Sequence, residues 1–118
     1  GFWLTPAVFA DVTNDMTIAR GEIFGPVLSV LDFEEEAEVL ARANASPMGL
    51  SAYAFTRCPS RARRTTRALK SGKVGINSFA LAASEAPFGG TNFSGLGREG
   101  GSEGIEDYLD TKLAQIVF

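Results

Sequence analysis

The chain has 118 residues, enough for one domain, and 45% of them are apolar, enough for a packed core. Its net charge of −3 argues against nucleic-acid binding, which requires a basic face, so no nucleic-acid partner is expected. With no histidine and one cysteine, the sequence lacks the residues for the usual zinc sites, for Ser-His or Cys-His catalytic pairs and for an internal disulfide, so no metal site is expected.

The sequence shows no signal for a membrane or for export. No apolar run approaches the roughly 18 residues of a membrane helix, so no membrane partner is expected. One unpaired cysteine fits a reducing compartment, and we expect a cytoplasmic protein. The chain opens on Gly1-Phe2-Trp3-Leu4, without Met and with large apolar side chains, which is typical of a segment from the interior of a longer chain.

The first third of the sequence predicts two strands and a helix. Residues 2–12 are rich in β-forming side chains, and Pro6 favours an edge position. Residues 13–26 are expected to form a loop, and residues 27–33 are nearly all apolar, as in a buried strand. Residues 34–44 have a helical pattern, with acids at the N-terminal end, where the helix dipole favours them. One face of this helix carries Phe33, Ala37, Leu40 and Ala41.

The middle of the sequence continues this alternation. Residues 47–49 are a break, and residues 50–56 predict a strand. Pro59 suits the first turn of a second helix and Gly72 suits its end, and residues 73–77 predict a third strand. We therefore expect an α/β fold with a parallel strand-helix-strand-helix-strand core, because helical crossovers usually join parallel strands.

The last part of the sequence is rich in glycine and predicts mostly loops. A short helix is expected at about residues 102–109. The tail, residues 112–118 (KLAQIVF), is apolar and strand-like. An unpaired apolar strand at a chain end is a template for pairing with another chain, so we expect self-association through this tail.

Glu22 and Phe24 form a candidate sugar-binding pair just before the Gly25-Pro26 turn. In an extended segment, alternate positions place both side chains on the same side. A carboxylate can accept hydrogen bonds from both hydroxyls of a ribose, and an aromatic ring offers it a flat wall. The residues alone also allow a solvated glutamate and a core phenylalanine beside a turn.

Two glycine motifs follow, at residues 87–90 (PFGG) and 94–101 (SGLGREGG). Paired glycines permit positive φ and close backbone approach, and the first motif by itself is typical of a turn. The second fails the test for a dinucleotide-binding loop, because it follows a loop and does not join a strand to a long helix. Its adjacent Arg98 and Glu99 are expected to be exposed or ion-paired.

Taken together, the ordered motifs resemble the aldehyde dehydrogenase superfamily. They extend over nearly the whole chain, and it is their order and spacing that carry the resemblance. The motifs are Glu22–Val27 (EIFGPV), Ala43-Asn44, Gly49-Leu50, Phe55-Thr56, Gly72–Asn77 (GKVGIN), Pro87–Gly90 (PFGG), Ser94–Gly101 (SGLGREGG), and Tyr108 with Lys112.

The resemblance implies roles for several residues. Glu22 matches the glutamate that holds the hydroxyls of the nicotinamide ribose, and Phe24 matches the aromatic residue beside that ribose. Glu99 matches a glutamate used in proton transfer in some family members. Residues 78–86 match the loop at the aldehyde entrance, and the tail matches a strand used in subunit contact. The expected entrance residues are Ser78, Phe79, Leu81, Ser84 and Phe88.

Within the superfamily, the glycine-rich motif and Asp107-Tyr108-Leu109 look most like succinate-semialdehyde dehydrogenases. The serine with which those enzymes hold the substrate carboxylate falls at Ala82 or Ala83 here, which equally suits an apolar aldehyde. The family's nucleophilic cysteine lies upstream of this region. Cys58 is therefore not expected to be that nucleophile, although a helix N-terminus and two nearby arginines would make its thiol somewhat acidic.

The expected function is that of the C-terminal part of the catalytic domain, residues 1–118, including the oligomerisation tail. The whole enzyme would use NAD or NADP to oxidise an aldehyde to a carboxylic acid, and this segment alone would be inactive. Its partners would be the rest of the same enzyme, the aldehyde and further copies. The alternative is a non-catalytic interaction or oligomerisation module from a truncated gene.

Overall fold

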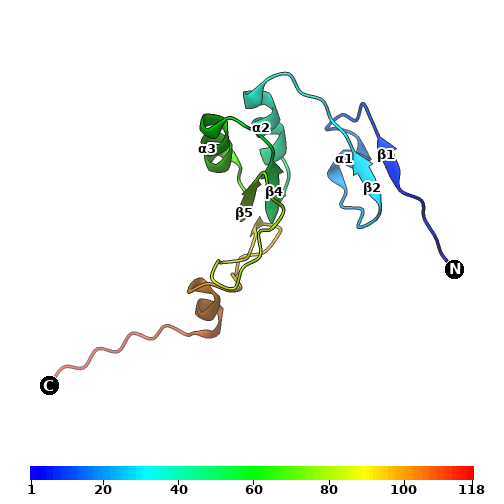
Figure 1. Cartoon of the computed structure of the whole chain (residues 1–118). Helices are drawn as coiled ribbons and strands as arrows, with labels where there is room; N and C mark the ends of the chain where they lie inside the picture. The colour runs from blue at the N-terminus through cyan, green and yellow to red at the C-terminus, as the bar shows by residue number, and fades with distance from the viewer. The chain divides into compact units, whose positions relative to one another are not determined.

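A computed structural model describes residues 1–118 as two units, Gly1–Ser46 and Pro47–Phe118, each of which is described by itself (Figure 1). Both units are mixtures of short helices and strands, as the predicted α/β class requires. No helix in either unit is long and apolar enough to span a lipid bilayer.

The first unit is built around a parallel pair of strands. Strand β1 (Ala7–Phe9) lies beside β2 (Val27–Ser29) in the register Ala7↔Val27, Val8↔Leu28, Phe9↔Ser29. A parallel pair needs a crossover, and the short helix α1 (Thr17–Arg20) occupies it, where the sequence predicted only a loop. The structure also shortens the predicted strand over residues 27–33, because β1, its only partner, ends at Phe9.

Helix α2 (Glu36–Asn44) confirms the predicted helix but starts two residues later. Glu36 and Glu38 lie in its first turn and Arg42 in its last, which complements the helix dipole. Of the four residues expected on one face, Leu40 is half-buried, and the other three are exposed, namely Phe33, Ala37 and Ala41. A helical pattern marks which face is apolar, but burial needs a partner surface.

Arg42 links α2 to the rest of the first unit. Its Nε donates to Asn14 Oδ1 at 2.6 Å. Its Nη1 donates to two acceptors, the Asp32 carbonyl at 2.7 Å and Glu38 Oε1 at 2.8 Å. The Arg42 guanidinium also lowers the pKa of the Glu38 carboxyl, because it donates a hydrogen bond to the charged form. These bonds replace part of the tertiary contact that apolar burial does not supply here.

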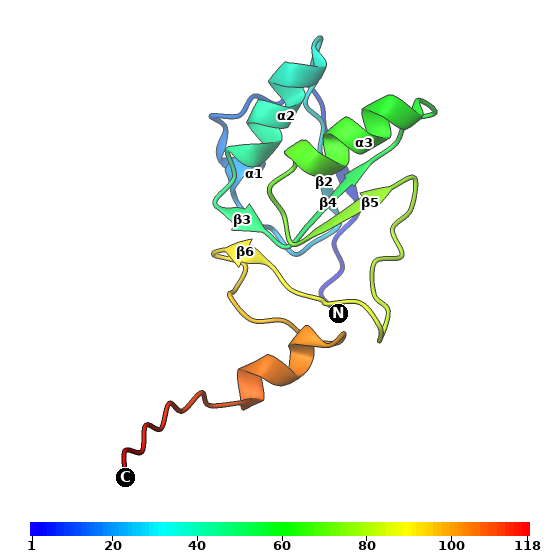
Figure 2. The ribbon, with the colours of Figure 1, turned by 90° about the vertical axis from the view of Figure 1, so that its left-hand side faces the viewer.

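The second unit contains the predicted strand-helix-strand crossover. Strand β4 (Ser51–Ala54), helix α3 (Pro59–Ala68) and strand β5 (Lys73–Ile76) follow one another, and the strands pair in parallel from Ser51↔Lys73 to Ala54↔Ile76. Figure 2 shows α3 lying along this strand pair. Pro59 opens α3 as predicted, but the helix ends at Ala68, before Gly72.

The predicted five-element parallel core is only partly confirmed. β2 pairs with β1, and β4 pairs with β5, so the strands predicted within residues 27–77 belong to two different sheets and not to one. A third pair, antiparallel, joins β3 (Met48–Gly49) to β6 (Thr91–Asn92). Apolar periodicity identifies strands, but it does not state which strands pair.

The end of the chain has little regular structure. A 3-10 helix, η1 (Glu103–Tyr108), stands where a short helix was predicted. Residues 112–118 form no strand, contrary to the prediction, because no neighbouring strand of this chain pairs with them. Every side chain of this tail is exposed, Leu113 to 93% and Val117 to 84%.

Few side chains are buried in either unit. Val12, at 6% exposure, is the only apolar side chain that is buried, and Thr65 is the only buried polar one. Most aromatic and aliphatic side chains, from Phe2 to Phe118, stay accessible to solvent. Exposed apolar area on this scale usually marks surfaces that other protein covers.

Gly72, in the turn between α3 and β5, lies very close to the backbone of the loop at residues 87–90. A Cβ at Gly72 would lie 1.9 Å from the Gly89 carbonyl oxygen, so backbone has to move. We expect Gly72→Ala to lower the free energy of unfolding by about 1–3 kcal/mol, as overpacking does. In Gly25→Ala, the matched control, the new Cβ meets nothing closer than 3.6 Å. Equal urea midpoints for the two variants would contradict this packing.

Candidate functional site

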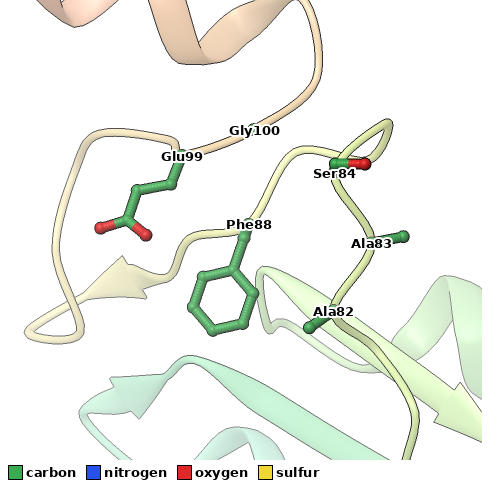
Figure 3. Close-up of a pocket in the computed structure, with 6 residues that line it drawn as sticks. All are labelled: Ala82, Ala83, Ser84, Phe88, Glu99 and Gly100. Carbon is green, nitrogen blue, oxygen red and sulfur yellow. The ribbon is translucent and has the colours of Figure 1, made fainter.

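A cavity of about 440 Å³ in the second unit is lined by two loops that lie far apart in the sequence (Figure 3). Its volume falls within the range typical of small-molecule sites. The first loop follows β5 and the second belongs to the glycine-rich motif. The lining residues are Ala82, Ala83, Ser84, Phe88, Glu99 and Gly100.

Backbone hydrogen bonds hold the two loops together. The Phe88 N–H donates to the Glu99 carbonyl at 2.6 Å, and the Glu99 N–H donates to the Phe88 carbonyl at 2.7 Å, so the pair forms an antiparallel bridge. A third bond runs from the Gly101 N–H to the Ser84 carbonyl at 3.0 Å. The bridge therefore brings an aromatic ring and a carboxylate to one cavity (Figure 3).

The glycines of residues 94–101 serve this close approach. Gly100 has φ +68°, and a Cβ there would lie 2.9 Å from the Ala86 carbonyl oxygen. The motif folds back on the loop that precedes it and does not lead into a long helix. This arrangement agrees with the sequence argument against a dinucleotide loop.

Arg98 and Glu99 are not ion-paired with each other. Arg98 Nη1 donates to the carbonyls of Gly90 and Gly97, both at 2.8 Å, and the Arg98 N–H donates to Asp107 Oδ2 at 3.1 Å. Arg98 is thus a structural tie for the loop. The exposed Glu99 carboxylate has no hydrogen bond or ion pair within the chain, which leaves it available to a ligand or a proton.

The structure separates the expected entrance residues into two groups. Ser84 and Phe88 line the cavity together with Glu99, whereas Ser78, Phe79 and Leu81 do not. Phe79 packs instead against two other aromatic rings. The distance between ring centroids is 5.1 Å to Tyr53 and 5.3 Å to Phe55. Ser78 Oγ accepts a hydrogen bond from the Ala80 N–H at 3.1 Å.

Ala82, Ala83 and Gly100 line the cavity but were not predicted as site residues. The sequence did carry a signal for the two alanines, because the count along the loop placed a substrate-contacting serine of related enzymes at those positions. It carried no signal for Gly100, because the backbone bridge between Phe88 and Glu99 is what places Gly100 at the cavity.

Glu22 and Phe24 lie in the first unit, in a segment without regular structure. Phe24 has φ +51°, a strained value for a bulky residue, so the alternation of an extended strand does not hold at this position. Its ring is 93% exposed, and the exposed Glu22 carboxylate has no partner in the chain. The chemistry of a free carboxylate and an open aromatic ring is compatible with a ribose diol.

Cys58 stands apart from the cavity. It is exposed at the N-terminus of α3, with Sγ 3.1 Å from Ser60 Oγ. The hydrogen bond from the Ser60 hydroxyl lowers the pKa of the Cys58 thiol, and the Arg61 N–H adds to the effect. No cluster of three or more histidine, cysteine or acidic side chains is arranged to hold a metal ion.

The family model described as "Aldehyde dehydrogenase family" matches residues 1–114. The chain therefore belongs to the aldehyde dehydrogenase family, a family of oxidoreductases. The match spans both units, including the loop with Glu22 and Phe24 and the cavity with Glu99.

A betaine aldehyde dehydrogenase of Rhizobium leguminosarum bv. trifolii is 53% identical over 116 residues, which are 98% of this chain and 24% of that protein. The NAD+ complex of a Bacillus cereus aldehyde dehydrogenase superposes with a TM-score of 0.88 at 46% identity, over 92% of this chain and 22% of that one. The NAD+ complex of a Mycobacterium tuberculosis aldehyde dehydrogenase superposes with a TM-score of 0.86 at 42% identity, also over 92% of this chain and 22% of that one.

These comparisons correct one expectation. Curated relatives at 50–53% identity are named betaine aldehyde dehydrogenases, so the closer likeness to succinate-semialdehyde dehydrogenases is not supported. The chain spans about a quarter of the length of the curated relatives it matches.

The environment of Cys58 predicts an acidic thiol. We expect its alkylation by iodoacetamide to reach half its maximal rate at a pH below that of an ordinary cysteine, because the Ser60 hydroxyl stabilises the thiolate. Ser60→Ala should move the midpoint upward, whereas Ser71→Ala, which removes a hydroxyl elsewhere in the same unit, should not. A midpoint that Ser60→Ala leaves unchanged would exclude the hydroxyl as the cause.

Proposed function

We propose that these residues form the C-terminal part of the catalytic domain of an NAD(P)-dependent enzyme that oxidises an aldehyde to a carboxylic acid. The single observation that carries the proposal is the family match over residues 1–114. The cavity with Glu99 and the exposed pair Glu22 and Phe24 supply two features that the activity needs, an entrance for the aldehyde and a contact for the cofactor.

The reaction divides between this segment and residues of a longer protein. By the resemblance, the nucleophilic cysteine and the general-base glutamate lie upstream. The thiolate attacks the aldehyde carbonyl, and water later hydrolyses the thioester to the acid. When bound, NAD or NADP supplies the hydride acceptor. On this division of roles the segment alone is inactive, and Cys58 has no catalytic part.

We assign Glu22 and Phe24 to the nicotinamide ribose and Glu99 to proton transfer at the cavity. Glu22 can accept hydrogen bonds from both ribose hydroxyls, which fixes the sugar, and the Phe24 ring offers a flat surface beside it. Glu99 is suited to carry a proton because its carboxylate is exposed to the cavity and has no competing partner.

For the substrate, betaine aldehyde is the first candidate. Several relatives at about half identity carry that name. Betaine aldehyde is a cation, and the free carboxylate of Glu99 at the cavity attracts a quaternary ammonium group. The same carboxylate would repel succinate semialdehyde, and Ala82 and Ala83 offer that substrate no hydroxyl. A neutral aldehyde of similar size is the second candidate, because those alanines form an apolar wall.

Glu22→Gln in the full-length enzyme tests the proposed cofactor contact. We expect kcat/KM to fall about ten- to a hundred-fold, since a charge-assisted hydrogen bond is lost, while the KM for the aldehyde changes little. NADH or NADPH formation with betaine aldehyde is the measurement. Cys58→Ala is the control and should leave turnover unchanged. An enzyme that oxidises no aldehyde would refute the proposed function, and an unaltered Glu22→Gln enzyme would refute only this residue's role.

The exposed tail predicts that copies of this chain associate. Leu113, Ile116 and Phe118 are at least 74% exposed, and apolar area hidden by pairing is worth about 25 cal/mol per Å². Light scattering on the chain should therefore give a mass above that of a monomer. Deletion of residues 112–118 should restore the monomer, whereas Phe2→Ser, at the other end, should not. A monomeric mass before and after the deletion would exclude the tail as an interface, and association without oxidation by the full protein would favour the interaction-module alternative.

A further inference from the structure

A positive charge lies against the ring of Phe88, which is part of the cavity wall. Lys73 Nζ lies 2.9 Å from the centre of the Phe88 ring. Phe88 lines the cavity, whereas Lys73 itself does not. Lys73 is the first residue of β5, which fixes its backbone, and its side chain is half-buried.

No carboxylate neutralises this ammonium. Lys73 takes part in no salt bridge, and its ammonium group contacts the ring of Phe88. The negative potential of an aromatic face attracts a cation, and the cation in turn draws that potential toward itself. A second cation that approaches the same ring would meet a weakened negative potential and the repulsion of the first charge.

We propose that Lys73 is a specificity-determining residue of the cavity, which weakens the binding of a cationic group relative to a neutral group of the same shape. The inference rests on the proposed function, because it takes the cavity as the aldehyde entrance. Glu99 acts in the opposite direction, since its unpaired carboxylate attracts a cation. The balance between Lys73 and Glu99 therefore sets whether the cavity favours a quaternary ammonium aldehyde or its uncharged counterpart.

The test uses two alcohols that the enzyme does not need to turn over. Choline and 3,3-dimethylbutan-1-ol have the same shape, and they differ in the quaternary atom, which is a charged nitrogen in the first and carbon in the second. Their dissociation constants for the full-length enzyme are measured by ligand-observed NMR titration. The ratio of the two constants reports charge preference and cancels general effects on folding.

Lys73→Met removes the charge and keeps the length of the side chain. We expect it to tighten choline binding about three- to tenfold and to change binding of the neutral alcohol by less than about twofold. Glu99→Gln should shift the ratio in the opposite direction. Lys70→Met is the matched control, because it removes the same charge from an exposed position three residues away.

Each outcome decides the inference. A ratio unchanged by Lys73→Met, an equal change in Lys70→Met, or failure of both alcohols to bind would overturn it. Equal weakening of both alcohols by Lys73→Met would also overturn it, because it would show that Lys73 only supports the ring. The proposed function is judged separately by aldehyde oxidation. If the enzyme is active and the ratio is unchanged, only the role of Lys73 is refuted. If the enzyme is inactive and the ratio shifts as expected, only the proposed activity is refuted.

Discussion

The cavity depends on the two backbone hydrogen bonds between Phe88 and Glu99. No helix or long strand positions either residue, so these bonds and the one from Gly101 to Ser84 fix the distance between the loops. They are possible because Gly100 adopts a positive φ and approaches the backbone of the other loop closely. An aromatic ring, a carboxylate and, against the ring, the Lys73 ammonium are thereby gathered from three separate parts of the sequence.

The rest of the chain has little to stabilise it by itself. Each of its sheets has only two strands, an arrangement that is marginal in water without further packing. Most large apolar side chains are exposed, and the hydrogen bonds of Arg42 in the first unit and Arg98 in the second supply ties that a packed core would otherwise provide. The chain makes up about a quarter of its relatives' length. A segment whose apolar faces pack against the rest of a longer protein would show the same scarcity of buried apolar side chains.

Local sequence signals predicted the elements well where the backbone itself is constrained. Pro59 marked the start of α3, the clustered acids marked the start of α2 to within two residues, and the parallel β4–β5 pair followed from the intervening helix. Phe88 and Glu99 were also singled out from their motifs. By contrast, α1 was missed because four residues are too few to show a period, and Ala82 and Gly100 were not chosen because their part in the cavity comes from backbone position and not from side-chain chemistry.

The sequence by itself determined the family, the order of the two longer helices and the strands beside them, and which residues are candidates to bind a sugar or move a proton. Those properties reside in local patterns and in the identity of single side chains. Only the tertiary structure decided that β2 pairs with β1 and not with β4, that Phe79 packs on Tyr53 and not at the cavity, and that Lys73 contacts Phe88. These are contacts between residues distant in the sequence, and no local periodicity encodes them, because each depends on how loops close in space.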